Sequence, residues 1–377
     1  MYKRLGVLLI IVLMASLVLF GCGTKEPATE ETGQTEQTET ASSKYGGTLK
    51  NAYFAPTNMD PAFYSTVPDE HIGRQYYDFL VFIDEDSQPD KTRSLAENWE
   101  ADETGKIWTF NLREGVKFHN GKEFTSRDVK FTFDRLRDPN VGAATVGMYS
   151  NIVDISTPDD YTVVFTLTNP NPDFLKDLAD YHAVIVDADN TDFATNFNGT
   201  GPFIVESYIP EDRITFKRNP DYWMKDAEGN QLPYLDGMEF IFLSDPSAQI
   251  EALRSGQVDY LFYLPAEAVP ILEGNPDVEV YQSPSNLSYV IHMRSDRKPA
   301  SDVRVRQALK LATDRSAILQ GAIGGLGVTG RDTPIGPSYK EFYLDVPEPE
   351  RDLEKAKQLS GSNATIAVMS GNFMQRG

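Results

Sequence analysis

One segment in the first half of the chain constrains the fold most, because it carries a strand signal followed closely by a turn signal. Residues 107–113 (IWTFNLR) alternate between apolar side chains on one face and polar side chains on the other. A period of two predicts a strand with one buried face. Asn120-Gly121 then predicts a tight hairpin turn, because both positions accept a positive φ.

A helix signal follows this turn, and similar signals recur downstream. Thr125 lies three residues before Asp128, which is the pattern of a capped N-terminus, and the predicted helix ends before Asp138-Pro139. Helices and strands alternate irregularly and without a fixed repeat, so we predict a mixed α/β (α+β) fold with several lobes. Further strands are expected over residues 161–167, 289–293 and 364–369, and helices from Asp245-Pro246 to Gly256 and from Ser301 onward.

Composition limits the class of protein. The chain has 377 residues, of which 40% are hydrophobic and 11% aromatic, so it can bury large cores and divide into two or three domains. Its 56 acidic residues outnumber 35 basic ones, and the net charge of -21 would repel the phosphates of a nucleic acid. Nucleic acid is therefore not an expected partner.

The amino-terminal residues indicate export. Lys3 and Arg4 precede an apolar run over residues 5–20, which is shorter than the about 20 residues that a membrane span needs. Such a pattern predicts a signal peptide over residues 1–21. Gly21-Cys22 resembles the end of a bacterial lipobox, so Cys22, the only cysteine, is the expected lipidation site. The alternative is an ordinary secreted protein whose thiol lies near the cleavage point.

Residues 22–44 predict an acidic, flexible tether between this anchor and the folded body. They contain no aromatic or branched aliphatic side chain, so they cannot bury enough apolar surface to offset chain entropy. Their carboxylates repel one another and extend the chain. The expected location is extracytoplasmic, as a membrane-anchored lipoprotein in the periplasmic space or on the outer face of the cell membrane.

Catalytic and metal-binding motifs are missing from the sequence. The four histidines are scattered, and none pairs with another at metal-ligand spacing. The chain has no GxSxG elbow, no P-loop and no GxGxxG after a predicted strand. Acid pairs such as Asp159-Asp160 stand among turn-forming residues and indicate solvated turns. We therefore predict a protein that is not an enzyme and that has no catalytic residue, no metal site and no cofactor.

A series of short motifs occurs in a fixed order along the chain. They lie at residues 59–62 (MDPA), 95–99 (LAENW), 108–113 (WTFNLR), 116–122 (VKFHNGK), 128–129 (DV), 199–203 (GTGPF), 218–223 (RNPDYW), 253–256 (LRSG), 302–309 (DVRVRQAL) and 314–315 (DR). This ordered series resembles the family 5 extracellular solute-binding proteins, the dipeptide and oligopeptide receptors of ABC importers. The likeness runs from about Gly46 to Lys357, and most of these motifs are expected to be scaffold, such as core tryptophans, turns and strand ends.

The resemblance implies a periplasmic-binding-protein type II-like clamshell with three lobes. Lobe I would be discontinuous, with residues 45–86 and 199–284, and lobe II would be an insertion over residues 87–198. Lobe III would comprise residues 285–377. Lobes I and III would close over a peptide held through its backbone, and an ABC permease with its ATPase subunits would read the closed state.

The resemblance also suggests ligand-binding residues in three places, each with an alternative. Ser65, Thr66 and Val67 match the segment that lies along the ligand backbone, or else form a plain surface loop. Tyr149 would offer an aromatic ring to the cleft, or else belongs to the core. His292 and Arg294 would end the strand entering lobe III, where Arg294 would meet a ligand carboxylate or else remain solvated.

Other functions stay open within this resemblance. Receptors of the same fold take oligosaccharides, nickel complexes, opines or haem, and a lipoprotein sensor or chaperone would use the fold without transport. An exported hydrolase would need a nucleophile or an acid pair in the cleft. Family members also extend past Gly377, so we expect a truncated chain with an incomplete lobe III, an unpaired strand edge and the acid for a peptide's amino terminus beyond its end.

Overall fold

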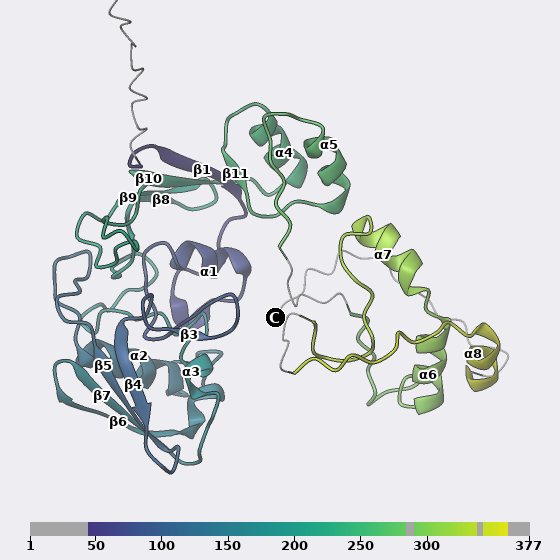
Figure 1. Cartoon of the computed structure of the whole chain (residues 1–377), viewed down its shortest axis with the longest axis horizontal. Coiled ribbons are helices and arrows are strands. Elements are labelled where there is room, and N and C mark those ends of the chain that lie inside the picture. The colour runs from purple at the N-terminus through teal and green to yellow at the C-terminus, as the bar shows by residue number, and fades with distance from the viewer. Residues whose placement is uncertain (1–43, 284–289, 338–341, 361–377) are drawn as a thin grey trace, which may run out of the picture. The chain divides into compact units, whose positions relative to one another are not determined.

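The computed structural model describes residues 44–283, 290–337 and 342–360 (Figure 1). Its largest sheet has five strands in the order β11-β1-β10-β9-β8. β1 runs parallel to both β10 and β11, whereas β10, β9 and β8 pair in antiparallel fashion. The strands are β1 (Thr48–Tyr53), β8 (Phe203–Ile209), β9 (Arg213–Arg218), β10 (Gly237–Phe242) and β11 (Tyr260–Leu261).

Helix α4 (Pro246–Arg254) connects β10 to β11, which lie on opposite sides of β1. The Asp245 side chain accepts a hydrogen bond from the backbone N–H of Ser247, and Gly256 follows the helix with a φ of 71°. Ala252 of this helix is buried in a small cluster with Ala52 of β1 and Val258. The predicted helix from Asp245-Pro246 to Gly256 is therefore confirmed.

The second sheet is antiparallel, with the order β4-β5-β7-β6. Its core contains Phe110 and Phe165 from neighbouring strands and Phe133 from α2 (Ser126–Arg137). Trp99 and Trp108 are partly buried against this core, so they lie at its margin. The strands are β4 (Ala96–Ala101), β5 (Ile107–Leu112), β6 (Ile152–Asp159) and β7 (Thr162–Leu167), which confirms the strands predicted over 107–113 and 161–167.

The turn at Asn120-Gly121 has the predicted place but a different geometry. The N–H of Phe118 donates to the carbonyl of Lys122, and the N–H of Gly121 donates to the carbonyl of Phe118. Three residues therefore form the loop, and only Gly121, with a φ of 85°, takes the left-handed conformation. This is a turn followed by a glycine bulge and not the two-residue loop that the dipeptide predicts. The flanking pairing is a single bridge between Lys117 and Glu123.

The capped helix is confirmed. α2 begins directly after Thr125, whose backbone N–H donates to the carboxylate of Asp128 at 2.9 Å. Its last residue is Arg137, and Asp138 follows in an extended conformation. The smaller elements of this part are η1 (Pro61–Phe63), α1 (Val67–Gly73), β2 (Phe82–Ile83), β3 (Pro89–Asp90), η2 (Met148–Asn151), α3 (Phe174–Asp177), η3 (Ala266–Ala268) and α5 (Val269–Glu273).

Two of the sequence motifs meet at a buried carboxylate, Asp78. Its oxygens accept hydrogen bonds from the Thr200 hydroxyl at 2.9 Å, the Tyr222 hydroxyl at 3.1 Å and the Trp223 indole N–H at 2.9 Å. Burial raises the pKa of Asp78, although these three donors oppose the shift. Tyr222 and Trp223, which follow β9, thus have a structural role, as expected for a scaffold motif.

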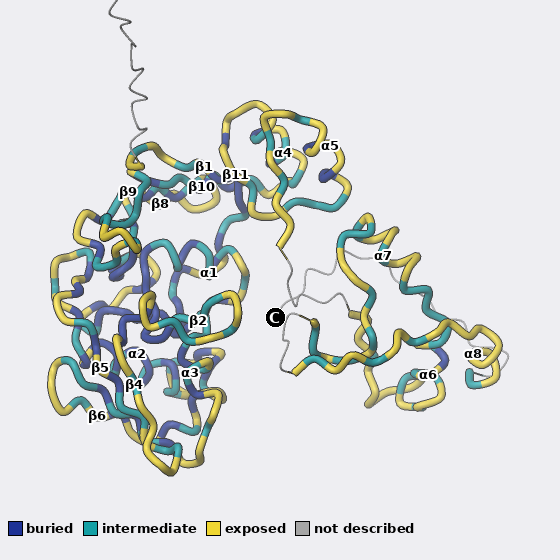
Figure 2. Tube along the Cα trace, in the orientation of Figure 1, coloured by how far each residue is buried: buried dark blue, intermediate teal, exposed yellow. Residues whose placement is uncertain are grey.

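The described residues of 290–337 and 342–360 include three helices with little buried surface. The helix predicted from Ser301 begins at Val303, because the Asp302 side chain caps it through the N–H of Arg304. Figure 2 shows mostly exposed and intermediate positions here, and Ala308 and Ala356 are the buried residues among those described. The helices are α6 (Val303–Ala312), α7 (Arg315–Ile323) and α8 (Leu353–Ser360).

One sequence prediction is wrong in this part of the chain, and two others fall on residues that the structure does not describe. Residues 290–293 are not in a strand, so the strand predicted over 289–293 is wrong for its described residues. A short apolar run forms a strand only where a neighbouring strand pairs with it, and residues 290–293 have no such partner among the described residues. The strand predicted over 364–369 lies outside the described residues, as do residues 1–43 with Cys22.

Candidate functional site

The carboxyl ends of the parallel strands β1 and β11 mark a candidate binding site. In open α/β sheets, ligands bind beyond the carboxyl ends of strands, where neighbouring connections diverge. β1 ends at Tyr53, and β11 ends at Leu261. The chain leaves β1 towards α1, whereas it leaves β11 towards α5. The segments at residues 54–67 and 262–263 therefore start from the same end of the sheet.

A buried carboxylate, Asp69 of α1, organises the loop after β1. Asp69 is 0% exposed and accepts hydrogen bonds from the backbone N–H groups of Thr57 at 2.6 Å, Asn58 at 3.2 Å, Ser65 at 2.9 Å and Thr66 at 3.1 Å. The Thr57 hydroxyl donates to the same carboxylate at 2.9 Å. Two stretches of the loop are therefore held to one side chain, which orders the whole segment.

This arrangement places the first group of predicted ligand residues. The Ser65 hydroxyl lies 3.2 Å from that of Thr57, and Ser65 and Val67 are exposed. Thr66 is half-buried, and its hydroxyl oxygen is buried without a hydrogen-bond partner. All three residues lie at the N-terminus of α1, beside the end of β1. Their contact with a ligand remains a prediction.

Three aromatic rings meet beside this loop. The Tyr53 hydroxyl lies 2.6 Å from Nδ1 of His71, and their rings stack with centroids 5.9 Å apart. Phe262, which directly follows β11, packs edge-on against His71 at 4.1 Å and against Tyr53 at 5.9 Å. Phe262 is 48% exposed, and its neighbours Tyr260 and Tyr263 are each 45% exposed. The end of the sheet thus presents aromatic surface next to the ordered loop.

The other predicted ligand residues lie elsewhere. Tyr149 is 1% exposed, donates its hydroxyl to the carbonyl of Asp177 at 2.8 Å and packs edge-on against Phe133. This arrangement agrees with the alternative that Tyr149 belongs to the core. His292 and Arg294 are exposed, and the Arg294 guanidinium pairs with Asp296 at 2.7 Å. For these three residues, too, ligand contact remains a prediction.

Sequence reasoning missed Asp69, His71 and Phe262. The first had a usable signal, because Asp69 follows Thr66 by three residues, in the same pattern that identified the cap at Thr125 and Asp128. No local signal indicated His71 or Phe262. They are 191 residues apart in the chain, and only the pairing of β11 with β1 brings them together.

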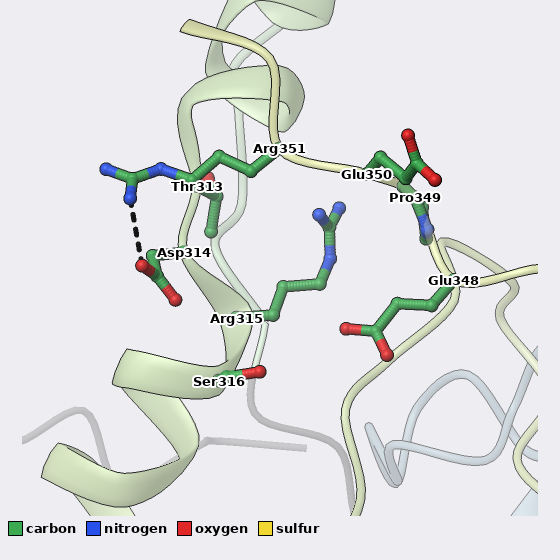
Figure 3. Close-up of a pocket in the computed structure, with 8 residues that line it drawn as sticks. All are labelled: Thr313, Asp314, Arg315, Ser316, Glu348, Pro349, Glu350 and Arg351. Carbon is green, nitrogen blue, oxygen red and sulfur yellow. Dashed lines mark hydrogen bonds and ion pairs between the residues drawn. The ribbon is translucent and has the colours of Figure 1, made fainter.

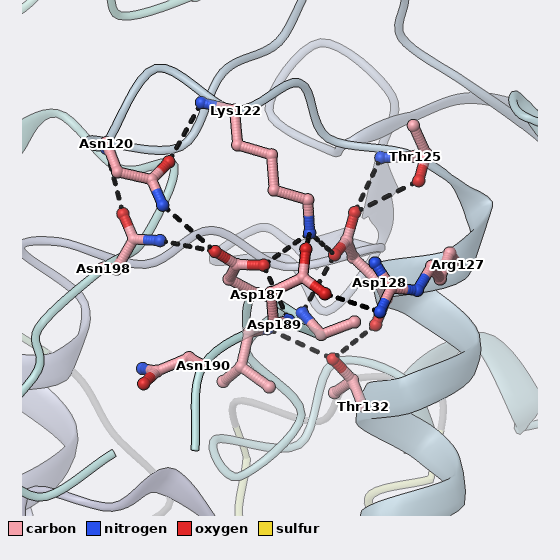
Figure 4. A network of polar contacts seen from close by, with 12 residues as sticks. Asn120, Lys122, Thr125, Arg127, Asp128, Thr132, Asp187, Asp189, Asn190 and Asn198 are labelled. Carbon is pink, nitrogen blue, oxygen red and sulfur yellow. Dashed lines mark hydrogen bonds and ion pairs between the residues drawn. The ribbon is translucent and has the colours of Figure 1, made fainter. Parts of the chain in front are cut away.

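A second polar cluster centres on Lys122 and does not form an open site (Figure 4). The Lys122 ammonium contacts the carboxylates of Asp128 at 2.9 Å, Asp187 at 2.5 Å and Asp189 at 2.9 Å. Burial disfavours the charged amine, but the carboxylates outweigh this and raise the pKa of Lys122. Because the amine already fills the space between three carboxylates, the cluster fastens the loop before α2 to the segment around Asp187.

Neither of two hollows in the described part of the chain is lined by a predicted ligand residue. One, of about 300 Å³, lies beside Arg113, whose guanidinium stacks on Trp223 at 4.8 Å. The other, of about 320 Å³, is lined by charges of both signs, including the ion pair between Arg351 and Asp314 at 2.9 Å (Figure 3). It is lined by Thr313, Asp314, Arg315, Ser316, Glu348, Pro349, Glu350 and Arg351.

The described residues offer neither a cluster of metal ligands nor a membrane-spanning helix. No three histidine, cysteine, aspartate or glutamate side chains there are grouped so that they could hold a metal ion. Within the same residues, no helix combines the length and the apolar character needed to cross a bilayer.

Comparison with solved structures defines the class. The fold matches that of the ABC transporter-associated periplasmic binding protein DppA from Helicobacter pylori in complex with peptide STSA, with a TM-score of 0.72 and 27% identity over 84% of this chain and 65% of that one. It also matches AgaA from A. tumefaciens R10 in complex with agropinic acid, with a TM-score of 0.70 and 30% identity over 83% and 63% of the two chains. The predicted mixed α/β fold, similar to periplasmic binding proteins of type II, is confirmed.

The sequence identifies the family within this class. Residues 92–362 match the bacterial extracellular solute-binding proteins, family 5, so the chain belongs to that family. The glutathione-binding protein GsiB of Escherichia coli K12 is 28% identical over 320 residues, which cover 82% of this chain. The chain spans 61% of the length of that relative.

Proposed function

We propose that this chain is the substrate-binding component of an ABC importer, which captures short peptides outside the membrane and delivers them to the permease and its ATPase subunits. Membership of family 5 supports this role, as does the similarity to DppA, solved with a peptide, and to a glutathione-binding protein. The function is capture and release, so we expect no catalytic turnover.

The observation that carries the proposal is the ordered loop at the end of β1. Asp69 holds Ser65 and Thr66 through their backbone N–H groups, and a loop fixed by the chain's own hydrogen bonds reduces the entropic cost of binding. The adjoining aromatic surface at Phe262 suits peptide side chains of varied shape. We retain Ser65, Thr66 and Val67 as proposed ligand-binding residues, and Tyr149, His292 and Arg294 as proposals with weaker structural support.

The three-lobe division is part of the same proposal. The five-stranded sheet is drawn from residues 48–53 and 203–261, and the four-stranded sheet from residues 96–167 between them. This interruption of one sheet by another supports a discontinuous lobe I, over residues 45–86 and 199–284, with lobe II as its insertion. Lobe III would begin at residue 285. Ligand binding would select the closed arrangement of lobes I and III.

The proposed anchor is a lipid on Cys22, followed by the acidic tether over residues 22–44. A tethered receptor has a high effective concentration beside its permease, which favours delivery. Replacing Cys22 with serine should move the protein from the membrane fraction to the soluble fraction while ligand binding is retained. Retention of Cys22→Ser in the membrane fraction would exclude this form of attachment.

Mass spectrometry of ligands that copurify with the chain tests the proposed function. We expect a heterogeneous set of short peptides, released on denaturation. Adding such a peptide should also raise the unfolding temperature, since a ligand that binds only the native state stabilises it by mass action. A single oligosaccharide as the only copurifying ligand would overturn the peptide assignment.

A second candidate ligand follows from AgaA, solved with agropinic acid and 30% identical to this chain. A receptor for a compound of that kind would copurify with one small acid and not with a peptide mixture. Its affinity for the dipeptide Met-Leu would then be negligible. The same mass spectrum therefore separates the two candidates.

A further inference from the structure

We propose that His71 contacts the ligand directly, donating a hydrogen bond from Nε2–H to an acceptor oxygen of the bound peptide, and that Tyr53 is the residue that positions it. This inference rests on the proposed peptide-binding function and assigns a specificity-determining residue to that site. The acceptor is a backbone carbonyl or a carboxylate oxygen, which are the acceptors that every peptide offers.

The buried tyrosine determines which ring nitrogen of His71 carries the proton. Tyr53 is 2% exposed, and Nδ1 of His71, at 2.6 Å, is the one acceptor found for its hydroxyl among the described residues. A buried hydroxyl hydrogen without an acceptor is unfavourable, so the hydroxyl donates to Nδ1. Burial raises the pKa of Tyr53, which keeps this proton on the hydroxyl. In neutral His71, the ring proton must then be on Nε2.

The surroundings keep His71 neutral. Burial lowers the pKa of the imidazole, and the adjacent Arg74 acts in the same direction, while Glu70 opposes the shift. A neutral imidazole with its acceptor nitrogen occupied offers one donor, Nε2–H. It can therefore recognise an acceptor oxygen without adding a formal charge to the site.

That donor is available. The described residues contain no hydrogen bond to Nε2 of His71, and this atom is not among the fully buried polar atoms that lack a partner, so it reaches solvent. The ring is held on two sides, by the hydrogen-bonded Tyr53 and by the edge-on ring of Phe262 at 4.1 Å. A fixed donor that is not fully enclosed, beside half-exposed aromatic surface, is what a ligand-contacting group requires.

The location ties His71 to the ordered loop. His71 lies on α1, two residues after Asp69, whose carboxylate holds Ser65 and Thr66. The same short helix thus carries the residue that orders the loop and the residue that offers the donor. A peptide lying along the loop would pass the exposed edge of this helix, where Val67 is also exposed.

The first test compares two variants of the purified chain by calorimetric titration with the dipeptide Met-Leu and with glutathione. His71→Phe keeps a ring but removes the donor, and we expect the Kd of the peptide that binds to rise about tenfold. His71→Gln retains an N–H donor and an oxygen that accepts from Tyr53, so its Kd should stay within about threefold of wild type. Unfolding curves must show that both variants fold.

The second test isolates the positioning role of Tyr53. In wild type, nitrogen-15 spectra of the His71 ring should show a protonated Nε2 and an unprotonated Nδ1. Tyr53→Phe should produce a mixture of tautomers and a Kd raised about threefold. Tyr161→Phe is the matched control, because it also removes a hydrogen-bonded phenol, here paired with Glu123 in another part of the chain. It should change neither the tautomer nor the Kd.

The outcomes separate this inference from the function on which it rests. If wild type binds a peptide and His71→Phe binds it equally well, His71 is not a ligand contact, while the peptide-binding function stands. A protonated Nδ1 in wild type would overturn the positioning role of Tyr53. If wild type neither carries nor binds any peptide, the proposed function fails, and this inference fails with it.

Discussion

The two sheets use their aromatic residues in opposite ways. In the core that the four-stranded sheet shares with α2 and α3, Phe110, Phe133, Phe165 and Phe174 are at most 2% exposed, and they pack edge-to-face with centroids 5.3 to 6.5 Å apart. The carboxyl end of the five-stranded sheet instead leaves about half of Phe262 exposed. A sealed core holds a shape, whereas aromatic surface left in water gains free energy when a ligand covers it.

The two regions also use the same helix cap for different purposes. Asp128 and Asp69 are both 0% exposed, and each follows its capping threonine by three residues. Asp128 is paired with Lys122 at 2.9 Å, and Lys122 also pairs with Asp187. The ion pairs hold the start of α2 to the segment around Asp187. Within the described residues, no lysine or arginine forms an ion pair with Asp69, and loop N–H groups balance its charge instead. One cap serves stability, and the other orders a candidate binding loop.

The largest expected effect tests the contrast between the aromatic groups. Phe165→Ala should lower the free energy of unfolding by about 3 to 5 kcal/mol, because it leaves a cavity in a sealed core. Phe262→Ala should cost far less stability and should weaken peptide binding. Urea unfolding and peptide titration measure the two properties. Equal losses of stability in both variants would show that Phe262 is as tightly packed as the core, and would contradict the contrast between the two aromatic groups.

A smaller effect tests the contrast between the two caps. Asp69→Ala should cost about 2 to 3 kcal/mol of stability, because four N–H groups of the loop lose their common acceptor, and it should abolish most peptide affinity. Asp192→Ala is the matched control. Its exposed carboxylate also accepts backbone N–H groups, from Ala194 and Thr195, but in a loop outside the candidate site. Wild-type peptide affinity in Asp69→Ala would refute the proposed role of the loop.

The smallest effect concerns pH and the cluster around Lys122. The Arg127 and Lys122 side chains lower the pKa of Asp189 from 3.8 to about 2. A lowered carboxyl pKa contributes stability that is present above pH 3.8 and is lost as the pH falls through about 2. In Asp189→Asn, the denaturant midpoint of unfolding should therefore depend less on pH between pH 3.8 and about 2 than it does in wild type. Peptide binding should change little. An unchanged slope would mean that this exposed ion pair adds nothing measurable.

Where prediction from sequence succeeded, the signal was local. The strand over residues 107–112, the helix after Thr125 and the helix from Asp245 all followed from periodicity and capping within a few residues. Where a neighbouring segment decides the outcome, prediction failed or stopped short. Residues 290–293 include the β-branched Val290 and Ile291 but have no strand partner among the described residues, and the Asn120-Gly121 turn took a three-residue loop.

The amino-acid sequence by itself determined the class of fold, the local elements and the family, because each rests on short-range patterns repeated in order along the chain. Only the tertiary structure decided which side chains share a site. Tyr149 is buried in the core of the four-stranded sheet, and Phe262 reaches His71 only because β11 pairs with β1. Contacts between residues so distant in the chain depend on sheet pairing and packing, which no local pattern encodes.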